Sequence, residues 1–221
     1  INGIDTKKFS PEVDKSEVLQ ELGITEDENT IVYISRLDES RSLVAKQLVK
    51  ILPRLDKIVE NLRLVVVGSG DDYENVLKLS QDTNEEMGRE AVILTGARTD
   101  INRLISPAKL FVGVSRSALE AMAEAKPTIV AGNEGYIGLF TPEKLQVGID
   151  TNFCCRGCEE STEEKLMQEI GEFFGMWDDD IKNLSDFSRE TILKHYSVTK
   201  MADDALMAYE ASISEKCKKE E

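Results

Sequence analysis

Cysteine, histidine and long apolar runs are scarce in this chain of 221 residues, and each shortage excludes a class of protein. The cysteines are a cluster of Cys154, Cys155 and Cys158 and the distant Cys217, which is not the pattern of a secreted disulfide framework. No signal peptide is recognisable, so we expect a reducing, cytoplasmic compartment. No apolar run approaches the roughly 20 residues that cross a bilayer, so we expect no integral membrane segment.

Basic residues are also few, because 27 Lys and Arg stand against 42 Asp and Glu and give a net charge of −15. Such a balance excludes nucleic acid and anionic membranes as main partners, since both require a basic surface. It leaves room for a local basic pocket that binds a small phosphate ligand. The apolar fraction of 41% and the charged fraction of 31% are those of an ordinary globular protein with a buried core.

Short apolar runs alternate with stretches of helical periodicity along the chain. We expect strands at 31–35, 62–67, 92–94, 109–113 and 128–131, and a short sixth strand at 147–149. Helices are expected at 11–22 (Ser10 as N-cap, Gly23 as stop), 42–59 (kinked or ended early by Pro53), 72–86, 100–105, 118–125 and in much of the region from 161 onward. This alternation predicts an α/β fold, with a parallel sheet in the middle of three layers and helices on both faces.

The domain organisation follows from the absence of a Pro-, Gly- or Ser-rich linker and of an internal repeat. We expect one domain over residues 1–221, made of a lead-in segment (1–29), a sheet core (30–160) and a helical C-terminal tail (161–221). Ligands of such sheets bind beyond the carboxyl ends of the strands. The loops that follow the predicted strands are therefore where a site is expected.

Two arginines, Arg36 and Arg41, follow the first predicted strand. The planar arginine fork donates two hydrogen bonds to a phosphate and keeps its charge, so this pair points to an anionic ligand. In so acidic a chain the pair is more informative than usual. The alternative is a pair of surface arginines that balance Asp38 and Glu39.

The loop after the second strand begins a G-x-G turn with Gly68 and Gly70. The dinucleotide-binding fingerprint needs a small residue three positions further on, where this chain has Tyr73. The turn also follows the second strand, not the first. An NAD-dependent oxidoreductase is therefore disfavoured, and the segment is interpreted as a tight turn between strand and helix.

The loop after the fourth strand is a small-residue turn that opens a helix. The backbone N–H groups at a helix start attract anions, and hydroxyl and guanidinium groups there add donors. The residues concerned are Gly113, Ser115, Arg116 and Ser117, with Glu120 near the first turn. The alternative is an ordinary capped helix in which Glu120 interacts favourably with the dipole.

Three glycines fall within residues 132–138, after the fifth strand, with Gly135 in the middle. Such a segment suits a loop that approaches a ligand closely, and a mobile surface loop is the alternative. The single histidine, His195, lies in a late helical stretch and is interpreted as a partly buried structural residue in preference to a general base. A zinc site built from the cysteine cluster and His195 lacks a paired ligand, so we expect no metal.

Several of these segments together resemble one family, the C-terminal, donor-binding domain of GT-B glycosyltransferases of family 4 (group 1). The resemblance spans nearly the whole chain, and it is the combination of segments that is specific. The segments are Asn2–Phe9 (N-G-I-D-x-x-x-F), Ile34–Arg41 (similar to G-R-L-x-x-x-K), Val66–Gly70 (V-G-x-G), Leu94–Gly96 before the base-binding loop, and Leu119–Pro127 (similar to L-E-A-M-A-x-G-x-P).

The resemblance implies a Rossmann-like donor domain and assigns roles to the residues above. Arg36 and Arg41 are implied to be catalytic, holding the donor diphosphate, and Glu120 is implied to bind the donor ribose. The turn from Gly113 to Ser117 is implied to meet donor phosphate or sugar. The full implied donor-binding set is Gly68, Gly96, Arg98, Gly113, Ser115, Arg116, Ser117, Glu120 and Gly135.

The sequence departs from the family pattern at the sugar end of the site. The family often has a second glutamate eight residues before the first, and Val112 stands there. The usual E-G-F-G is replaced by the residues from Gly113 to Arg116, as in a subgroup that carries R-S-A-L-E-A-M-A. Arg41 stands where lysine is usual.

The implied activity is transfer of a hexosyl group from a UDP- or GDP-linked sugar to an acceptor, with retention of configuration and without metal or other cofactor. The chain begins at Ile1, not at Met, and we expect that an N-terminal, acceptor-binding domain is absent from it. The chain is then expected to bind nucleotide without transferring sugar, and the missing domain would provide any contact with a membrane surface. The alternative is a stand-alone module that binds a nucleotide or phosphometabolite.

Overall fold

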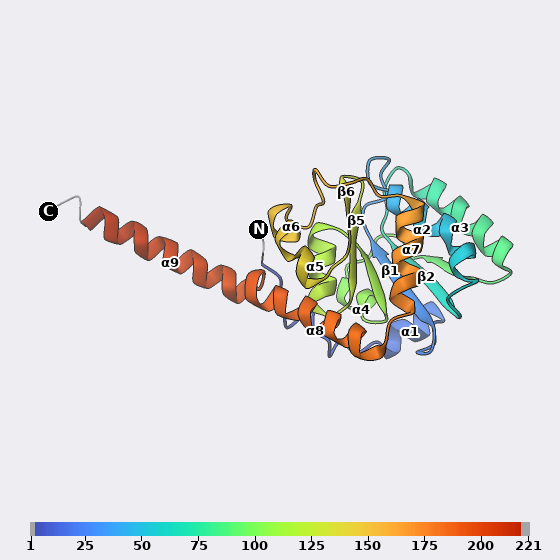
Figure 1. The fold of residues 1–221 in the computed structure, drawn as a ribbon, viewed down its shortest axis with the longest axis horizontal. Coiled ribbons are helices and arrows are strands. Elements are labelled where there is room, and N and C mark those ends of the chain that lie inside the picture. Colours follow the sequence, from blue (N-terminus) through green and yellow to red (C-terminus); the bar gives the residue numbers. More distant parts are fainter. Residues whose placement is uncertain (1–2, 218–221) are drawn as a thin grey trace.

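Six strands form one sheet in the centre of the fold (Figure 1). The computed structural model describes the backbone of residues 3–217 and the side chains of residues 3–209. The order in the sheet is β3-β2-β1-β4-β5-β6, and all neighbours are parallel except β5 and β6. The strands are β1 (Asn29–Ile34), β2 (Leu62–Val67), β3 (Val92–Leu94), β4 (Leu110–Gly113), β5 (Thr128–Gly132) and β6 (Gly135–Leu139).

The inner strands are continuous runs of β-branched and other apolar residues, because both faces of the sheet are covered. Ile31 and Val66 face one buried cluster, whereas Val32 and Val65 face the other. Each fully buried aliphatic side chain of this size contributes about 1.5–3 kcal/mol to folding. The three-layer α/β prediction is confirmed by this arrangement.

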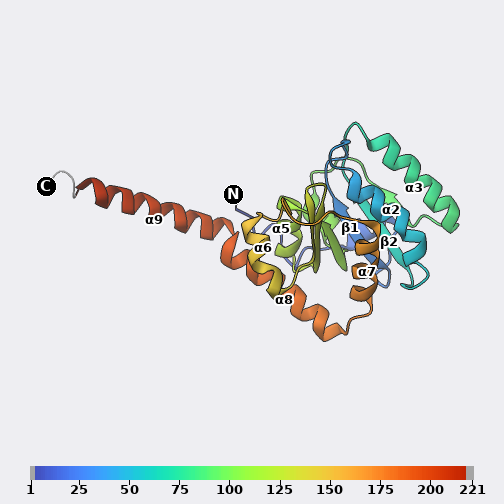
Figure 2. The ribbon, with the colours of Figure 1, turned by 45° about the horizontal axis from the view of Figure 1, so that its top comes forward.

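Helices cover both faces of the sheet (Figures 1 and 2). One apolar cluster joins the sheet to α2, α3 and α7, and the second joins it to α1, α4, α5, α6 and α8. The helices are α1 (Ser16–Leu22), α2 (Leu43–Leu55), α3 (Tyr73–Met87), α4 (Ile101–Ile105), α5 (Ser115–Ala123), the 3₁₀ turn η1 (Pro142–Lys144), α6 (Leu145–Asp150), α7 (Glu163–Phe174), α8 (Asp178–His195) and α9 (Val198–Cys217).

The sixth strand differs from the prediction in position and direction. Residues 147–149 lie in helix α6, where Gly148 packs against the rings of Phe140 and Phe153, so the predicted strand there is wrong. The sixth strand is β6, in the segment that the sequence suggested to be a glycine-rich loop. It returns antiparallel to β5 through a two-residue turn, because Gly132 pairs with Gly135. The sheet is therefore mostly, not entirely, parallel.

The ends of the helices agree only in part with the caps and stops predicted from the sequence. Gly23 ends α1 in the left-handed conformation, as predicted, with φ +61°. Ser10 is not the N-cap of that helix, because α1 begins at Ser16 and the Ser10 hydroxyl accepts from the N–H of Glu12 at 3.3 Å. Pro53 lies inside α2, whose last residue is Leu55, so the helix ends before the expected residue 59.

The N-terminal segment and the last helices lie side by side (Figure 1). The N–H of Ile4 donates to Tyr196 O at 2.7 Å, and the N–H of Val198 donates to Ile4 O at 3.0 Å. Beyond this junction α9 extends away from the sheet as a single helix in both views (Figures 1 and 2). Among residues 3–217, no helix combines the length and the apolarity that crossing a membrane requires.

Candidate functional site

A cavity of about 520 Å³ opens at the carboxyl ends of β1, β4 and β5. The strand order reverses between β1 and β4, and this switch point is where open α/β sheets bind ligands. The residues that line the cavity are Tyr33, Ser35, Arg36, Ser40, Arg41, Val114, Ser115, Gly132, Asn133, Glu134, Cys154 and Arg156. Three of the predicted site residues, Arg36, Arg41 and Ser115, are therefore brought together.

The side chains of Arg36 and Arg41 make no ion pair with any described residue. Both are exposed in the cavity. Most other arginines of the described chain are neutralised by a carboxylate, and these are Arg63, Arg89, Arg98, Arg103, Arg116 and Arg156. In a chain with a net charge of −15, two uncompensated guanidinium groups at one cavity form a local anion-binding surface.

The loop that carries the two arginines is fixed by the G-x-G turn after β2. The N–H of Leu37 donates to Ser69 O at 3.0 Å, and the N–H of Asp72 donates to Leu37 O at 2.9 Å. A Cβ on Gly68 would collide with the carbonyl oxygen of Ser35, and one on Gly70 would collide with the backbone of Leu37. The glycines are therefore needed for close approach of two backbones, which is the turn predicted from the sequence.

Asp72 ties the arginine loop to the helices behind it. Its side chain is 2% exposed and accepts hydrogen bonds from the hydroxyl of Ser42, from the ammonium group of Lys46 and, at 2.7 Å, from the Asn75 amide. Burial alone would raise the pKa of Asp72, but hydrogen bonds from Lys46, Ser42 and Asn75 outweigh it and lower this pKa to about 2. The carboxylate is thus a permanent anchor that joins the starts of α2 and α3.

Tyr33 forms part of the cavity lining and was not predicted as a site residue. Its hydroxyl donates to the backbone carbonyl of Arg41 at 3.3 Å. Burial raises the pKa of Tyr33 to about 12, so the hydroxyl stays protonated and remains a donor. The sequence shows Tyr33 only as one more apolar residue of a strand, because nothing in the strand pattern marks which residue reaches the loop.

The turn after β4 forms the middle of the cavity. Ser115, a non-glycine residue, has φ +52°, a left-handed conformation that costs of order 1 kcal/mol and is held by the N–H of Ser115 donating to Phe153 O at 2.7 Å. The Ser117 hydroxyl donates back to Val114 O at 3.0 Å. A Cβ on Gly113 would press on the ring of Phe111. Helix α5 therefore begins with its free N–H groups at the cavity edge.

Glu120 lies on α5 beside this turn and is 7% exposed. Its Oε1 accepts from Nε of Arg116 at 2.8 Å. Burial raises the pKa of Glu120, while the charges of Arg116 and Lys8 partly counter the increase. The pair joins two of the predicted site residues, and neither of them lines the cavity itself.

The loop after β3 supports the site from the side. The carbonyl of Gly96, which has φ +73°, accepts from the N–H of Gly68 at 3.0 Å. The guanidinium group of Arg98 is held by Glu21 and by Asp100, the latter at 2.7 Å. Of these predicted residues, Gly96 braces the G-x-G turn, and Arg98 is turned toward α1 by its ion pairs.

The opposite wall of the cavity comes from the β5–β6 turn and from the loop after α6. Glu134 and Arg156 form an ion pair across these two segments, with Arg156 Nη2 2.9 Å from Glu134 Oε1. Gly135, with φ +153°, leaves no room for a Cβ because the carbonyl of Cys155 lies against it. The sequence marked the glycines of this segment, but it gave no sign that Arg156 would pair with Glu134.

The cysteine cluster contributes one residue, Cys154, to the cavity lining. All three cysteines of the cluster are free, and burial raises the pKa of the Cys155 thiol to about 12. Cys217 falls among residues whose side chains are not described. Within the described part of the chain, no group of three or more His, Cys, Asp and Glu side chains is arranged to hold a metal ion.

His195 is exposed at the end of α8. The prediction of a partly buried structural histidine is therefore wrong. The residue is the last of its helix, where the chain turns toward α9, and no core residue covers it. It does not line the cavity described above.

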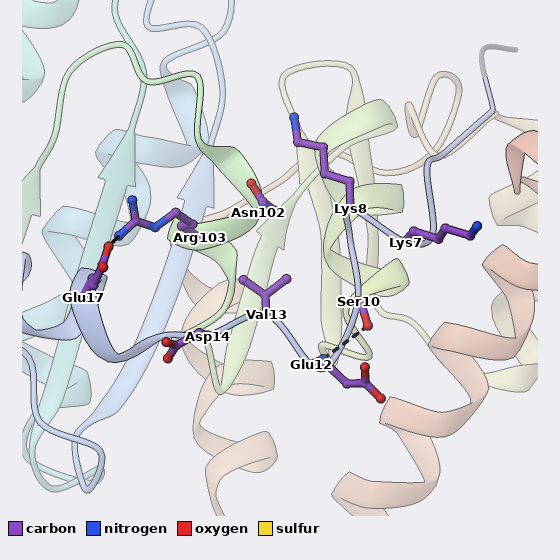
Figure 3. Close-up of a pocket in the computed structure, with 9 residues that line it drawn as sticks. All are labelled: Lys7, Lys8, Ser10, Glu12, Val13, Asp14, Glu17, Asn102 and Arg103. Atoms are coloured by element: carbon purple, nitrogen blue, oxygen red, sulfur yellow. Dashed lines mark hydrogen bonds and ion pairs between the residues drawn. The ribbon is translucent and has the colours of Figure 1, made fainter.

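A second cavity, of about 650 Å³, lies between the N-terminal segment and α4 (Figure 3). Lys8 and Asn102 occupy one end of it, and Glu12 and Asp14 occupy the other (Figure 3). Its wall combines basic side chains (Lys7, Lys8 and Arg103) with acidic ones (Glu12, Asp14 and Glu17). The cavity therefore presents no surface of one charge, in contrast to the cavity that Arg36 and Arg41 line.

The sheet order and the cation-lined cavity at its switch point are typical of α/β proteins that bind phosphate-bearing ligands. A sequence model of the family described as glycosyl transferases group 1 matches residues 14–168. The match covers more than half of the chain, which therefore belongs to this family. A comparison with curated protein sequences gave no match.

Solved structures support the fold. The glycosyltransferase from Rickettsia africae ESF-5 superposes with a TM-score of 0.71 at 18% identity, over 95% of this chain and 55% of that one. Anabaena Alr3699/HepE in complex with UDP-glucose gives 0.68 at 16%, over 95% and 56%. The C-terminal domain of the group 1 glycosyl transferase LpcC from Francisella tularensis gives 0.64 at 15%, over 89% and 100%. The chain thus spans about half the length of the first two and all of an isolated C-terminal domain.

Proposed function

We propose that this chain is the donor-binding half of a glycosyltransferase that moves a hexosyl group from a UDP- or GDP-linked sugar to an acceptor. The observation that carries the proposal is the pair of uncompensated guanidinium groups, Arg36 and Arg41, on one cavity at the switch point of the sheet. Membership of the group 1 family supports it. A structural neighbour that was solved with UDP-glucose bound is consistent with a donor of this kind.

The proposed mechanism uses the two arginines to stabilise the leaving group. When the bond between the sugar and the diphosphate breaks, negative charge grows on the diphosphate oxygens. The backbone of the loop that carries Arg36 and Arg41 is held in place before this happens, which lowers the cost of bringing the two guanidinium groups to that charge. Because they supply positive charge, we propose a reaction that needs no metal. Retention at the anomeric carbon is a separate part of the proposal and is what the family resemblance implies.

The remaining predicted residues receive supporting roles in this proposal. Glu120 accepts hydrogen bonds from the ribose hydroxyls, and the start of α5 offers the N–H groups of Arg116 and Ser117 and the hydroxyl of Ser115 to the phosphates. Gly68 and Gly96 bring the backbone close to the nucleotide. The donor site of the proposal also contains Gly113 and Gly135. Arg98, whose guanidinium group is held by Glu21 and Asp100, is proposed to support the site from the loop after β3.

We assign the acceptor to a second domain, because the chain spans about half the length of two of its structural neighbours. Helix α9 carries Leu206, Met207 and Tyr209 with 60–70% of each residue exposed, and the proposal assigns this apolar surface to the contact with that domain. The chain alone then binds nucleotide and transfers no sugar. The proposal places it in the cytoplasm, with any membrane-surface contact made by the second domain.

Thermal unfolding in the presence of nucleotides tests the donor site. UDP, GDP, UDP-glucose and GDP-mannose are each added to the wild type, to Arg36→Ala and to Arg54→Ala. A ligand present at 100 times its Kd stabilises the folded state by about 2.7 kcal/mol, which raises Tm by several degrees. We expect at least one nucleotide to raise Tm in the wild type, and this effect to fall in Arg36→Ala.

Arg54→Ala is the matched control, because Arg54 is an exposed arginine on α2 that does not line the cavity. It should retain the full increase in Tm. If no nucleotide raises the Tm of the wild type, the donor-site assignment is wrong.

A stand-alone module that binds a nucleotide or phosphometabolite is the second candidate, since the same cavity would serve it. The gene sequence immediately before Ile1 separates the two. An in-frame region of domain size supports the transferase, whereas a start codon directly before Ile1 supports the module.

A further inference from the structure

The two walls of the donor cavity differ in charge. The wall after β1 carries Arg36 and Arg41, which lack carboxylate partners among the described residues. The wall after β5 carries Glu134, and no other carboxylate is among the described residues that line the cavity. Because β4 lies between β1 and β5, the two walls stand two strand spacings apart, or roughly 10 Å. A ligand that fills the cavity therefore meets two unpaired cations at one end and the ion pair of Glu134 with Arg156 at the other.

The turn that carries Glu134 is built into the sheet. It is the two-residue connection of the β5–β6 hairpin, closed by the pairing of Gly132 with Gly135. On one side Gly132 lies against the side chain of Val114, which belongs to the turn after β4. On the other side Gly135 lies against the carbonyl of Cys155. The position of Glu134 is thus set by contacts with both neighbouring segments.

Arg156 orients the carboxylate of Glu134. Its Nη2 donates to Oε1 at 2.9 Å, and Glu134 strengthens the charged form, which raises the pKa of Arg156. One carboxylate oxygen is then engaged by the protein, and Oε2 keeps its lone pairs. Both residues reach the cavity, so the free oxygen is available to a ligand.

The charges of Glu134 and Arg156 determine which part of a ligand can bind at the wall after β5. Arg156 balances the charge of Glu134, whereas Arg36 and Arg41 have no carboxylate partner, so the diphosphate of a donor belongs at the arginine wall. A carboxylate is a strong acceptor of hydrogen bonds from hydroxyl groups, and bonds to a charged acceptor are worth more than neutral ones. The part of a donor that suits Glu134 is therefore an uncharged group with several hydroxyls, which is its sugar.

We infer that Glu134, held by Arg156, is the residue of this chain that recognises the donor sugar, by accepting hydrogen bonds from its hydroxyl groups. This inference rests on the proposed function. In that proposal Arg36 and Arg41 bind the diphosphate of the donor, and the inference adds a residue that binds its sugar. The position expected for a sugar-binding glutamate from the family resemblance holds Val112, which is fully buried in β4 and offers no polar group. Glu134 reaches the same cavity from the next strand.

Titration calorimetry of nucleotide against nucleotide-sugar tests the inference. UDP and UDP-glucose, and GDP and GDP-mannose, are titrated into the wild type, Glu134→Gln and Glu160→Gln. The quantity of interest is the ratio of the two affinities within each pair, because it isolates the contribution of the sugar. We expect Glu134→Gln to leave nucleotide affinity within twofold and to lower the ratio about tenfold, as for loss of one charged hydrogen bond.

Glu160→Gln is the matched control, since Glu160 is exposed, lies four residues beyond Arg156 and does not line the cavity. It should leave the ratio unchanged. Arg156→Gln, which removes the orienting partner and keeps Glu134, should lower the ratio by a smaller factor.

Three results would overturn the inference. An unchanged ratio in Glu134→Gln shows that the sugar does not meet this residue, and an equal loss for nucleotide and nucleotide-sugar shows that Glu134 acts on the phosphate end. A wild type that binds nucleotide with no preference for a nucleotide-sugar removes the sugar subsite altogether. If the wild type binds no nucleotide, the proposed function itself fails, and this outcome is distinct from the other three.

Discussion

Arg116 donates a hydrogen bond of 2.8 Å from Nε to Oε1 of Glu120, one turn further along α5. The carboxylate of Glu120 is almost fully buried, and its pKa is raised by that burial, whereas Arg116 and Lys8 act in the opposite direction. An ionised Glu120 would be the stronger acceptor for the ribose hydroxyls of the proposed donor. The ion pair opposes the effect of burial on the pKa and so favours the charged form of Glu120.

Replacing Arg116 should make nucleotide binding more sensitive to acid. In Arg116→Gln the pKa of Glu120 rises further, so the group protonates at higher pH and becomes a weaker acceptor for the ribose hydroxyls. The affinity for UDP or GDP, measured by calorimetry from pH 5 to pH 8, should begin to fall at a higher pH than in the wild type. Arg54→Gln removes the same charge from a remote, exposed position and should keep the wild-type profile. Superimposable profiles for Arg116→Gln and wild type would refute the role of the pair.

Loss of the Asp72 anchor should destabilise the protein and loosen the arginine loop. Asp72→Asn leaves the buried Ser42 and the half-buried Lys46 with a weaker acceptor, and we expect a loss of about 1–3 kcal/mol in the free energy of unfolding at pH 7. Because the pKa is lowered from 3.8 to about 2 on folding, this contribution is full above pH 4 and disappears as the pH falls through 2. Urea unfolding of the variant at pH 7 and at low pH measures both effects. Asp82→Asn, on the exposed side of α3, is the control and should change little.

Adding one methyl group at Gly70 should disturb the site without touching a charged residue. A Cβ there would collide with the backbone of Leu37, so Gly70→Ala must displace the loop that carries Arg36. We expect a loss of about 1–3 kcal/mol in stability and a lower nucleotide affinity. Gly175→Ala is the control, because its Cβ would meet its nearest neighbour at 3.4 Å. Wild-type affinity and stability in Gly70→Ala would show that the close approach of the two loops is dispensable.

Glu124 should make the protein less stable as the pH rises. Both of its carboxylate oxygens are buried without a hydrogen-bond partner among the described residues, and burial raises its pKa from 4.5 to about 9. The folded state therefore favours the protonated form. The free energy of unfolding should be highest below pH 4.5 and fall by up to about 1.4 kcal/mol per pH unit as the pH rises toward 8.

Glu124→Gln should remove this slope, since the amide does not ionise. Denaturant unfolding at pH 5, 6, 7 and 8 measures the slope in each protein, and the window ends at 8 because the nearby Lys126, whose pKa is lowered to about 8 by burial, begins to titrate there. Glu86→Gln changes an exposed position of α3 and should keep the wild-type slope. An identical pH dependence in Glu124→Gln and wild type would mean that Glu124 is ionised in the folded protein.

Much of the fold was predictable because the inner strands are buried on both faces and are therefore continuous apolar runs. The predicted strands at 62–67 and 92–94 coincide with β2 and β3. Strand β6 was missed because closely spaced glycines, such as Gly135 and Gly138, are typical of loops. In the structure both glycines have positive φ. Their conformations are set by contacts with Cys155 and Glu169, which are distant in sequence.

In the site, too, some residues were predictable from the sequence and others meet only in the folded chain. Arg36, Arg41 and Ser115 follow strands of a parallel sheet, and topology alone brings such loops together. Glu134 and Arg156 meet only because the chain after α6 returns to the β5–β6 turn. Tyr33 reaches the loop of Arg41 from within a strand, and the strand pattern cannot distinguish it from its apolar neighbours. No local pattern contains these relationships.

The central claim is that Arg36 and Arg41 hold the diphosphate of a nucleotide donor. The most direct measurement compares the Kd of UMP with that of UDP, or of GMP with that of GDP, in the wild type and in the double variant Arg36→Ala/Arg41→Ala. We expect the diphosphate to bind the wild type at least tenfold more tightly than the monophosphate, and the two to bind the double variant with nearly equal affinity. A preference for the diphosphate that survives in the double variant would contradict the claim.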